Sequence, residues 1–117
     1  MVSDVPPPEE AKKIAENLFK REAELDVLGV KFRVRRMTLK EELDWYEFRD
    51  KIFKNDAETS EKLVKIWEEL LQRCVVEPRC ARYTEELPGP VIMRLIDAIS
   101  ELHLWNVDFR LLRRASS

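Results

Sequence analysis

The sequence has little glycine, cysteine and histidine, and each shortage excludes a class of site. Only two glycines occur in 117 residues, which leaves little material for a phosphate-binding glycine-rich loop or a nucleophile elbow. Two cysteines, Cys74 and Cys80, and one histidine, His103, are fewer ligands than a zinc site normally uses. The cysteines could form a disulfide in a loop, although a reduced pair is the usual state in the cytoplasm. We therefore expect no enzymatic activity, no cofactor and no metal.

The sequence also lacks a long apolar run and a strong net charge. No stretch approaches the ~20 apolar residues of a membrane-spanning helix, and the acidic, proline-rich N-terminus lacks the layout of a signal peptide. A net charge of −2 gives no general attraction to nucleic acid or to an anionic membrane. Asparagine and glutamine are scarce while glutamate, lysine and arginine are abundant, a balance found in thermophilic proteins. These features predict a cytoplasmic protein with no membrane partner.

The composition is that of a small helical domain. Hydrophobic residues make up 44% and charged residues 38% of the chain, which is typical of a folded protein that needs no disulfide or metal for stability. We expect a single domain over residues 1–117, with a flexible tail at 1–7, a peripheral helix or partner-binding arm at 8–22, and a core at 23–112. The predicted fold class is mainly α (α+β): four to five helices with one small antiparallel β-hairpin.

Two amphipathic segments between residues 59 and 102 organise the chain. Apolar residues recur at helical spacing over 59–73 and again over 90–102. Neither helix can bury its apolar stripe alone, so we expect the two helices to pack together and form the core. Thr59 or Ser60 is the expected N-cap of the first helix. A polar turn or short helical piece at 79–86 should connect the two.

The segment before residue 38 changes to a period of two. Val30, Phe32 and Val34 alternate with Lys31, Arg33 and Arg35, which predicts a half-buried strand. Leu25 and Val27 should supply a short first strand, with the turn near Gly29, the residue best able to adopt a positive φ. An isolated hairpin is only marginally stable, so its apolar face is expected to lie against helices.

A capping box at Thr38 and Glu41 predicts a helix over residues 39–53. The side chains expected to make apolar contacts with the core are Leu43, Tyr46, Ile52 and Phe53. Trp45 and Phe48 lie further round the helix. This helix carries more aromatic residues than one buried face needs, so its surplus aromatic side is a candidate protein-binding surface. Packing of these residues in the core is the more common explanation. The candidate residues are Trp45, Tyr46 and Phe48, followed by Trp105 and Phe109 near the C-terminus.

The adjacent carboxylates and the single histidine have an ordinary structural interpretation. Adjacent carboxylates occur at Glu41–Glu42, Glu68–Glu69 and Glu85–Glu86. Neighbouring residues on a helix point in different directions, so we expect solvated helix faces and no catalytic dyad. His103 follows the last predicted helix and is expected to be a helix-end side chain and not a ligand or a base.

A local basic strip gives an alternative function. Lys31, Arg33, Arg35 and Arg36 could contact phosphate groups, as in a small nucleic-acid-binding or regulatory module. The more common explanation is a solvated strand face that protects an edge strand. Phosphate binding weakens steeply as salt concentration rises, whereas apolar binding between helices does not, so salt dependence distinguishes the two.

The order of the segments between residues 30 and 102 follows a recognisable pattern. A strand at 30–36 leads into a threonine-capped helix, Cys74-Val75-Val76-Glu77-Pro78 forms a turn, and Leu87-Pro88-Gly89-Pro90-Val91 starts a final amphipathic helix. This order resembles that in the tail assembly chaperones of long-tailed phages and prophages. The triple proline at 6–8 and the basic strand are not typical of that family.

The resemblance implies a non-enzymatic assembly factor with protein partners. Such chaperones coat a long, helical tape-measure protein, keep it soluble and help to recruit the major tail protein in the cytoplasm of the host cell. The resemblance supplies no catalytic residues. An exposed strand edge could also pair with a second copy, so a homo-oligomer is a further possibility. A small enzyme with a polar pocket that has no local motif is a third possibility.

Overall fold

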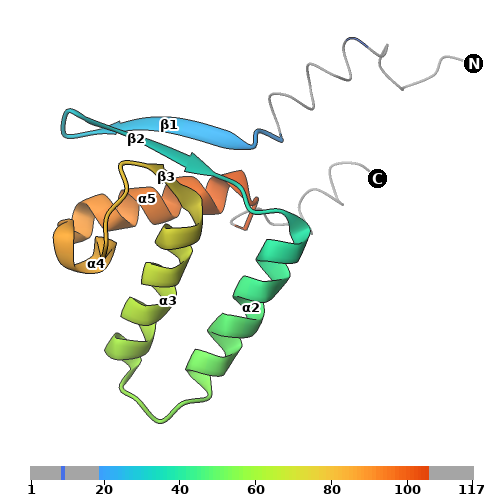
Figure 1. The fold of residues 1–117 in the computed structure, drawn as a ribbon, viewed down its shortest axis with the longest axis vertical. Coiled ribbons are helices and arrows are strands. Elements are labelled where there is room, and N and C mark those ends of the chain that lie inside the picture. The colour runs from blue at the N-terminus through green and yellow to red at the C-terminus, as the bar shows by residue number, and fades with distance from the viewer. Residues whose placement is uncertain (1–8, 10–18, 106–117) are drawn as a thin grey trace, which may run out of the picture.

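The computed structural model describes Glu9 and residues 19–105. Their elements are β1 (Glu22–Val27), β2 (Val30–Arg35), α2 (Leu39–Phe53), α3 (Thr59–Cys74), β3 (Val75–Glu77), α4 (Tyr83–Glu86) and α5 (Gly89–Leu102). The predicted fold class is confirmed, and the sheet has three antiparallel strands in the order β1-β2-β3. Figure 1 shows α5 along the sheet, while α2 and α3 form a helical hairpin that extends away from it.

The β1–β2 hairpin turns through Leu28 and Gly29, both with positive φ (53° and 84°). Two consecutive left-handed residues make the tight turn whose twist matches the flanking strands. The Gly29 N–H donates to the Oδ1 of Asp26 over 2.9 Å and stabilises the turn. The helix predicted at 8–22 falls mostly outside the described residues, but its predicted last residue, Glu22, belongs to β1. The alternation of charged and apolar residues therefore begins earlier than expected.

One face of the sheet forms the core together with α3 and α5. Phe32 and Val34 of β2 are buried against this layer, as are Leu95 and Ile99 of α5. The largest side chains with almost no exposed surface are Tyr83, Leu71, Leu95, Ile99, Val34, Val75 and Cys74. Burial of these apolar side chains supplies the main stabilising free energy. The two predicted amphipathic helices do contribute to one core, as expected.

Strand β3 was not predicted from the sequence. It follows α3 without a loop, because Cys74 ends the helix and Val75 begins the strand. Val75 pairs with Val34, and Glu77 pairs with Arg33 across a bulge. Three residues are too few to show a period, so only the pairing with β2 identifies this segment as a strand.

Helix α2 begins and ends at the predicted residues. The Thr38 Oγ accepts from the Glu41 N–H (3.3 Å), and Glu41 accepts from the Thr38 N–H (3.1 Å), which completes the capping box. The cap predicted for α3 at Thr59 or Ser60 is wrong. Thr59 is already helical, and the N-cap is Glu58, whose carbonyl accepts from the Lys62 N–H.

Replacing Thr38 should therefore destabilise the protein more than replacing Thr59. Thr38→Ala removes the hydroxyl that accepts from the first turn of α2 and should lower the free energy of unfolding by about 1 kcal/mol. Thr59→Ala removes a hydroxyl that makes no cap bond and should change it by less than about 0.5 kcal/mol. Urea denaturation of the two variants measures the difference. Equal losses would contradict the assigned caps.

Candidate protein-binding surface

Helix α2 has two apolar faces, and only one of them is buried. Trp45 is 5% exposed and belongs to the core, while Leu39, Leu43 and Phe53 are 71%, 55% and 50% exposed. These three residues, which we call the α2 stripe, lie on one side of the helix because their spacings of four and fourteen residues are close to whole turns. Figure 1 shows the helical hairpin of α2 and α3 that carries the stripe; Val64 on α3 is exposed as well.

This arrangement corrects the predicted orientation of α2. Leu43 and Phe53 were expected in the core, and Trp45 was expected on an exposed aromatic side. The structure reverses these positions, while Tyr46 and Phe48 are half-buried. Apolar residues on two faces of one helix leave its orientation undetermined by periodicity, since either face can form the core. The choice depends on a contact from a distant part of the chain.

That contact comes from Trp105, just after α5. Its indole stacks on that of Trp45 with ring centroids 5.0 Å apart and an angle of 15° between the planes. The indole N–H donates to Glu42 Oε1 (2.8 Å) and to the Tyr46 hydroxyl oxygen (2.9 Å). The Tyr46 hydroxyl donates to the same carboxylate oxygen. We call Glu42, Trp45, Tyr46 and Trp105 the Trp105 clasp. The predicted candidate Phe109 lies outside the described residues.

The clasp is partly buried, and a cation lies against two of its aromatic rings. The guanidinium of Arg49 lies 5.4 Å from the Trp45 ring centroid and 5.0 Å from that of Tyr46, at distances where a cation is attracted to an aromatic face. Burial raises the pKa of Tyr46, and its hydrogen bond to Glu42 raises it further. The clasp therefore joins α2 to the end of α5 and holds one face of α2 inward.

His103 strengthens the same junction. Its ring stacks on Trp105 with centroids 4.3 Å apart. Nε2 accepts from the Met37 N–H (2.9 Å), and Nδ1 lies 2.7 Å from the Ile99 carbonyl oxygen, to which it must donate. This pair of bonds requires the neutral ring. Burial, which disfavours the charged form, lowers the pKa of His103.

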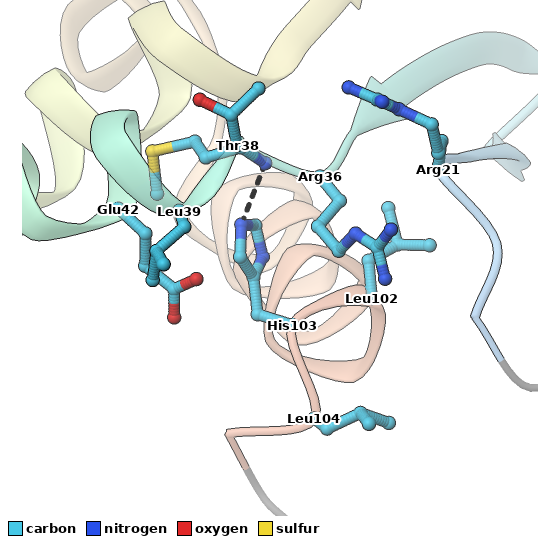
Figure 2. Close-up of a pocket in the computed structure, with 9 residues that line it drawn as sticks. Arg21, Arg36, Thr38, Leu39, Glu42, Leu102, His103 and Leu104 are labelled. Carbon is cyan, nitrogen blue, oxygen red and sulfur yellow. Dashed lines mark hydrogen bonds between the residues drawn. The ribbon is translucent and has the colours of Figure 1, made fainter.

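A pocket of about 430 Å³ lies beside this junction. Figure 2 shows Arg21 and Arg36 on one side of His103, and Leu39 and Glu42 on the other. Leu39 belongs to both the pocket and the α2 stripe, so the pocket adjoins the stripe at this residue. Among the residues that the structure describes, no group of three or more His, Cys, Asp or Glu side chains could hold a metal ion.

The basic strip is divided between two places. Lys31, Arg33 and Arg35 share the outer face of the sheet, because they alternate with buried Phe32 and Val34. Arg36 follows the strand and lines the pocket instead. The structure therefore does not bring all four predicted residues together.

Acidic residues surround the part of the strip that lies on the sheet. Opposite Lys31, Arg33 and Arg35, β1 places Asp26, Glu24 and Glu22. Arg33 forms an ion pair with Glu77 (3.0 Å), and Arg35 forms one with Glu41 (2.5 Å). The bond to Arg35 is the main reason why the pKa of Glu41 falls to about 2. A face of mixed charge offers less to a phosphate backbone than the strip alone predicted.

The adjacent carboxylates were expected to be solvated, and for Glu41, Glu42 and Glu68 this is wrong. Glu68 of α3 is half-buried and accepts from the N–H groups of Tyr83 (3.1 Å) and Thr84 (2.9 Å) at the start of α4. Burial works against its ionisation, but hydrogen bonds, including those from Thr84 and Gln72, lower its pKa overall. Glu68 thus caps a helix fifteen residues further along the chain, a role that no local sequence pattern reveals.

Comparisons of the chain with protein-family models, with curated proteins and with solved structures found no match. Within the described residues, no helix has both the length and the apolar character needed to cross a membrane.

Cys74 and Cys80 are free thiols, and burial raises the pKa of Cys74 to about 12. A thiol with so high a pKa is a poor nucleophile. The exposed stripe on α2 is therefore the feature of the molecule with the clearest capacity to bind a partner.

Truncation of Trp45 should destabilise the protein far more than truncation of Leu43. Trp45→Ala leaves a cavity in the core and removes the stacking partner of Trp105, so the free energy of unfolding should fall by about 3–5 kcal/mol. Leu43→Ala removes a half-exposed side chain and should cost less than about 1 kcal/mol. Chemical denaturation checks both values. A larger loss for Leu43→Ala than for Trp45→Ala would reverse the assignment of the two faces.

Stability should fall as the pH decreases through the range in which histidine titrates. The folded pKa of His103 lies below the ordinary value of about 6.5, so below that value the unfolded chain binds a proton that the folded chain excludes. The free energy of unfolding should therefore decrease between about pH 7.5 and pH 6. His103 is the one histidine in the sequence, so His103→Gln should abolish the decrease. The same slope in both proteins would exclude His103 as its cause.

Proposed function

We propose that this protein is a non-enzymatic assembly factor that binds helical segments of a long partner protein, as a phage tail assembly chaperone binds its tape-measure protein. The observation that carries the proposal is the α2 stripe. Leu39, Leu43 and Phe53 remain exposed although the opposite face of the same helix is buried. An apolar row along a helix is the surface to which a second amphipathic helix binds, with anchors at intervals of three, four or seven residues.

The surroundings of the stripe suit binding to a helix. Charged residues such as Lys40, Glu47 and Lys51 are exposed on α2 and can form the polar rim that protein interfaces typically have. The Trp105 clasp and the packing on α3 hold α2 in place before any partner arrives. A preorganised surface loses less conformational entropy on binding.

The size of the stripe favours reversible binding. Burying a Leu or Phe side chain completely contributes about 1.5–3 kcal/mol, and these three side chains are already partly covered in the free protein. Their combined contribution is a few kcal/mol before the cost of association is subtracted. Many weak sites along a long partner can keep it soluble and still release it, which is what an assembly chaperone requires.

The test is co-expression of this protein with the long helical protein that is encoded beside it, followed by a pull-down. We expect a soluble complex with several copies of this chain per partner. Leu43→Glu places a charge in the stripe and should reduce the captured partner at least about tenfold, which corresponds to about 1.4 kcal/mol. The matched control is Leu28→Asn, since Leu28 is 88% exposed but lies in the hairpin turn, where asparagine tolerates a positive φ.

The control should capture as much partner as the unaltered protein. Failure to capture or solubilise such a neighbour would contradict the proposal, as would full capture by a correctly folded Leu43→Glu variant. Binding of nucleic acid that weakens steeply between low and moderate salt would instead favour the alternative, contact with phosphates through Lys31, Arg33 and Arg35.

A further inference from the structure

Strand β1 has an open edge. Among the described residues, the order β1-β2-β3 leaves one side of β1 without a neighbouring strand. The Arg36 N–H bonds to the Arg21 carbonyl over 2.6 Å in the continuation of the β1–β2 ladder. Hydrogen-bonded pairs alternate with non-bonded pairs in an antiparallel ladder. The backbone groups of Glu22, Glu24 and Asp26 therefore point away from β2, toward the open side, and none of them bonds to another described backbone group.

A shallow groove of about 190 Å³ runs beside this edge, between β1 and α5. Ala23 and Leu25 line it from the strand, and Ala98 lines it from the helix. The two alanines are short, so the groove can accept apolar side chains from an additional strand. Asp97 and Glu101 lie on its helical side together with Arg94, so the helical side has two acidic residues and one basic residue.

The outer face of the same edge is acidic. Glu22, Glu24 and Asp26 are exposed and share that face, because they alternate with the inward-facing Ala23 and Leu25. The basic row of β2 flanks them on one side only. A new strand on the open side would place its outward side chains directly opposite the three carboxylates, where opposite charges stabilise a sheet and like charges destabilise it.

We propose that the β1 edge binds an extended peptide segment whose lysine or arginine residues alternate with apolar residues. The segment adds a fourth strand: its backbone bonds to Glu22, Glu24 and Asp26, its basic side chains face the three carboxylates, and its apolar side chains enter the groove over Ala23 and Ala98. Pairing of β1 with β1 of a second copy would bring acidic rows together and is disfavoured. This surface is on a different element from the α2 stripe and does not depend on the proposed function.

The test uses the full chain and a capped synthetic peptide, as long as β1, in which lysine and valine alternate. Titration should protect the amides of Glu22, Glu24 and Asp26 from hydrogen exchange, while the amides of Ala23 and Leu25, already in the ladder, should change little. A control peptide with the same composition, but with lysines and valines in separate blocks, should bind at least tenfold more weakly.

Two variants separate recognition from folding. The Glu22→Lys, Glu24→Lys double variant, which leaves the turn-stabilising Asp26 in place, should lose binding of the lysine–valine peptide and gain binding of an alternating glutamate–valine peptide. Glu24→Pro removes one outward N–H without removing a ladder bond, because edge strands tolerate proline at such positions, and should weaken binding of the lysine–valine peptide at least tenfold.

Three results would overturn the proposal. They are absence of peptide binding by the folded protein, protection of the three edge amides before any peptide is added, and a dimer in light scattering that the Glu24→Pro substitution dissociates. In the first case the carboxylates serve only to keep strand edges apart, and in the last the occupant is a second copy.

Discussion

The direct passage from α3 into β3 is the constraint on which the rest of the structure depends. Because Cys74 ends the helix and Val75 begins the strand, the direction of α3 is fixed by the pairing of Val75 with Val34 in β2. Cys74 has no exposed surface and Val75 almost none, so the junction lies inside the core. The helical hairpin is therefore joined rigidly to the sheet, with no loop through which it could swing.

The exposed stripe follows from how α2 is held between its two neighbours. Packing on α3 and the Trp105 clasp together require Trp45 to face inward. Once that face is chosen, Leu39, Leu43 and Phe53 have no described element to cover them. The binding surface that we propose is thus a consequence of the same contact that completes the core.

Local sequence patterns predicted α2 and the β1–β2 hairpin. Contacts between distant residues determined the orientation of α2 and the strand identity of β3. The capping box of Thr38 and Glu41 defined the start of α2, and the alternation around Phe32 defined the hairpin. The orientation of α2 depends on Trp105, which follows Trp45 by sixty residues, and on a hydrogen bond between Met37 and His103, separated by 66 residues. The strand identity of β3 depends on a partner 44 residues earlier, where Arg33 meets Glu77. Periodicity carries no information about such pairings.

The stacking of Trp45 on Trp105 has a spectroscopic consequence. Two indoles with centroids 5.0 Å apart are close enough for their electronic transitions to couple, so breaking the stack should change the circular dichroism of the protein. Trp67, the third tryptophan, lies on α3 outside this stack and contributes only a background signal. The chain therefore contains an intrinsic optical marker for the joining of α2 to the end of α5, and no label is needed to follow that junction.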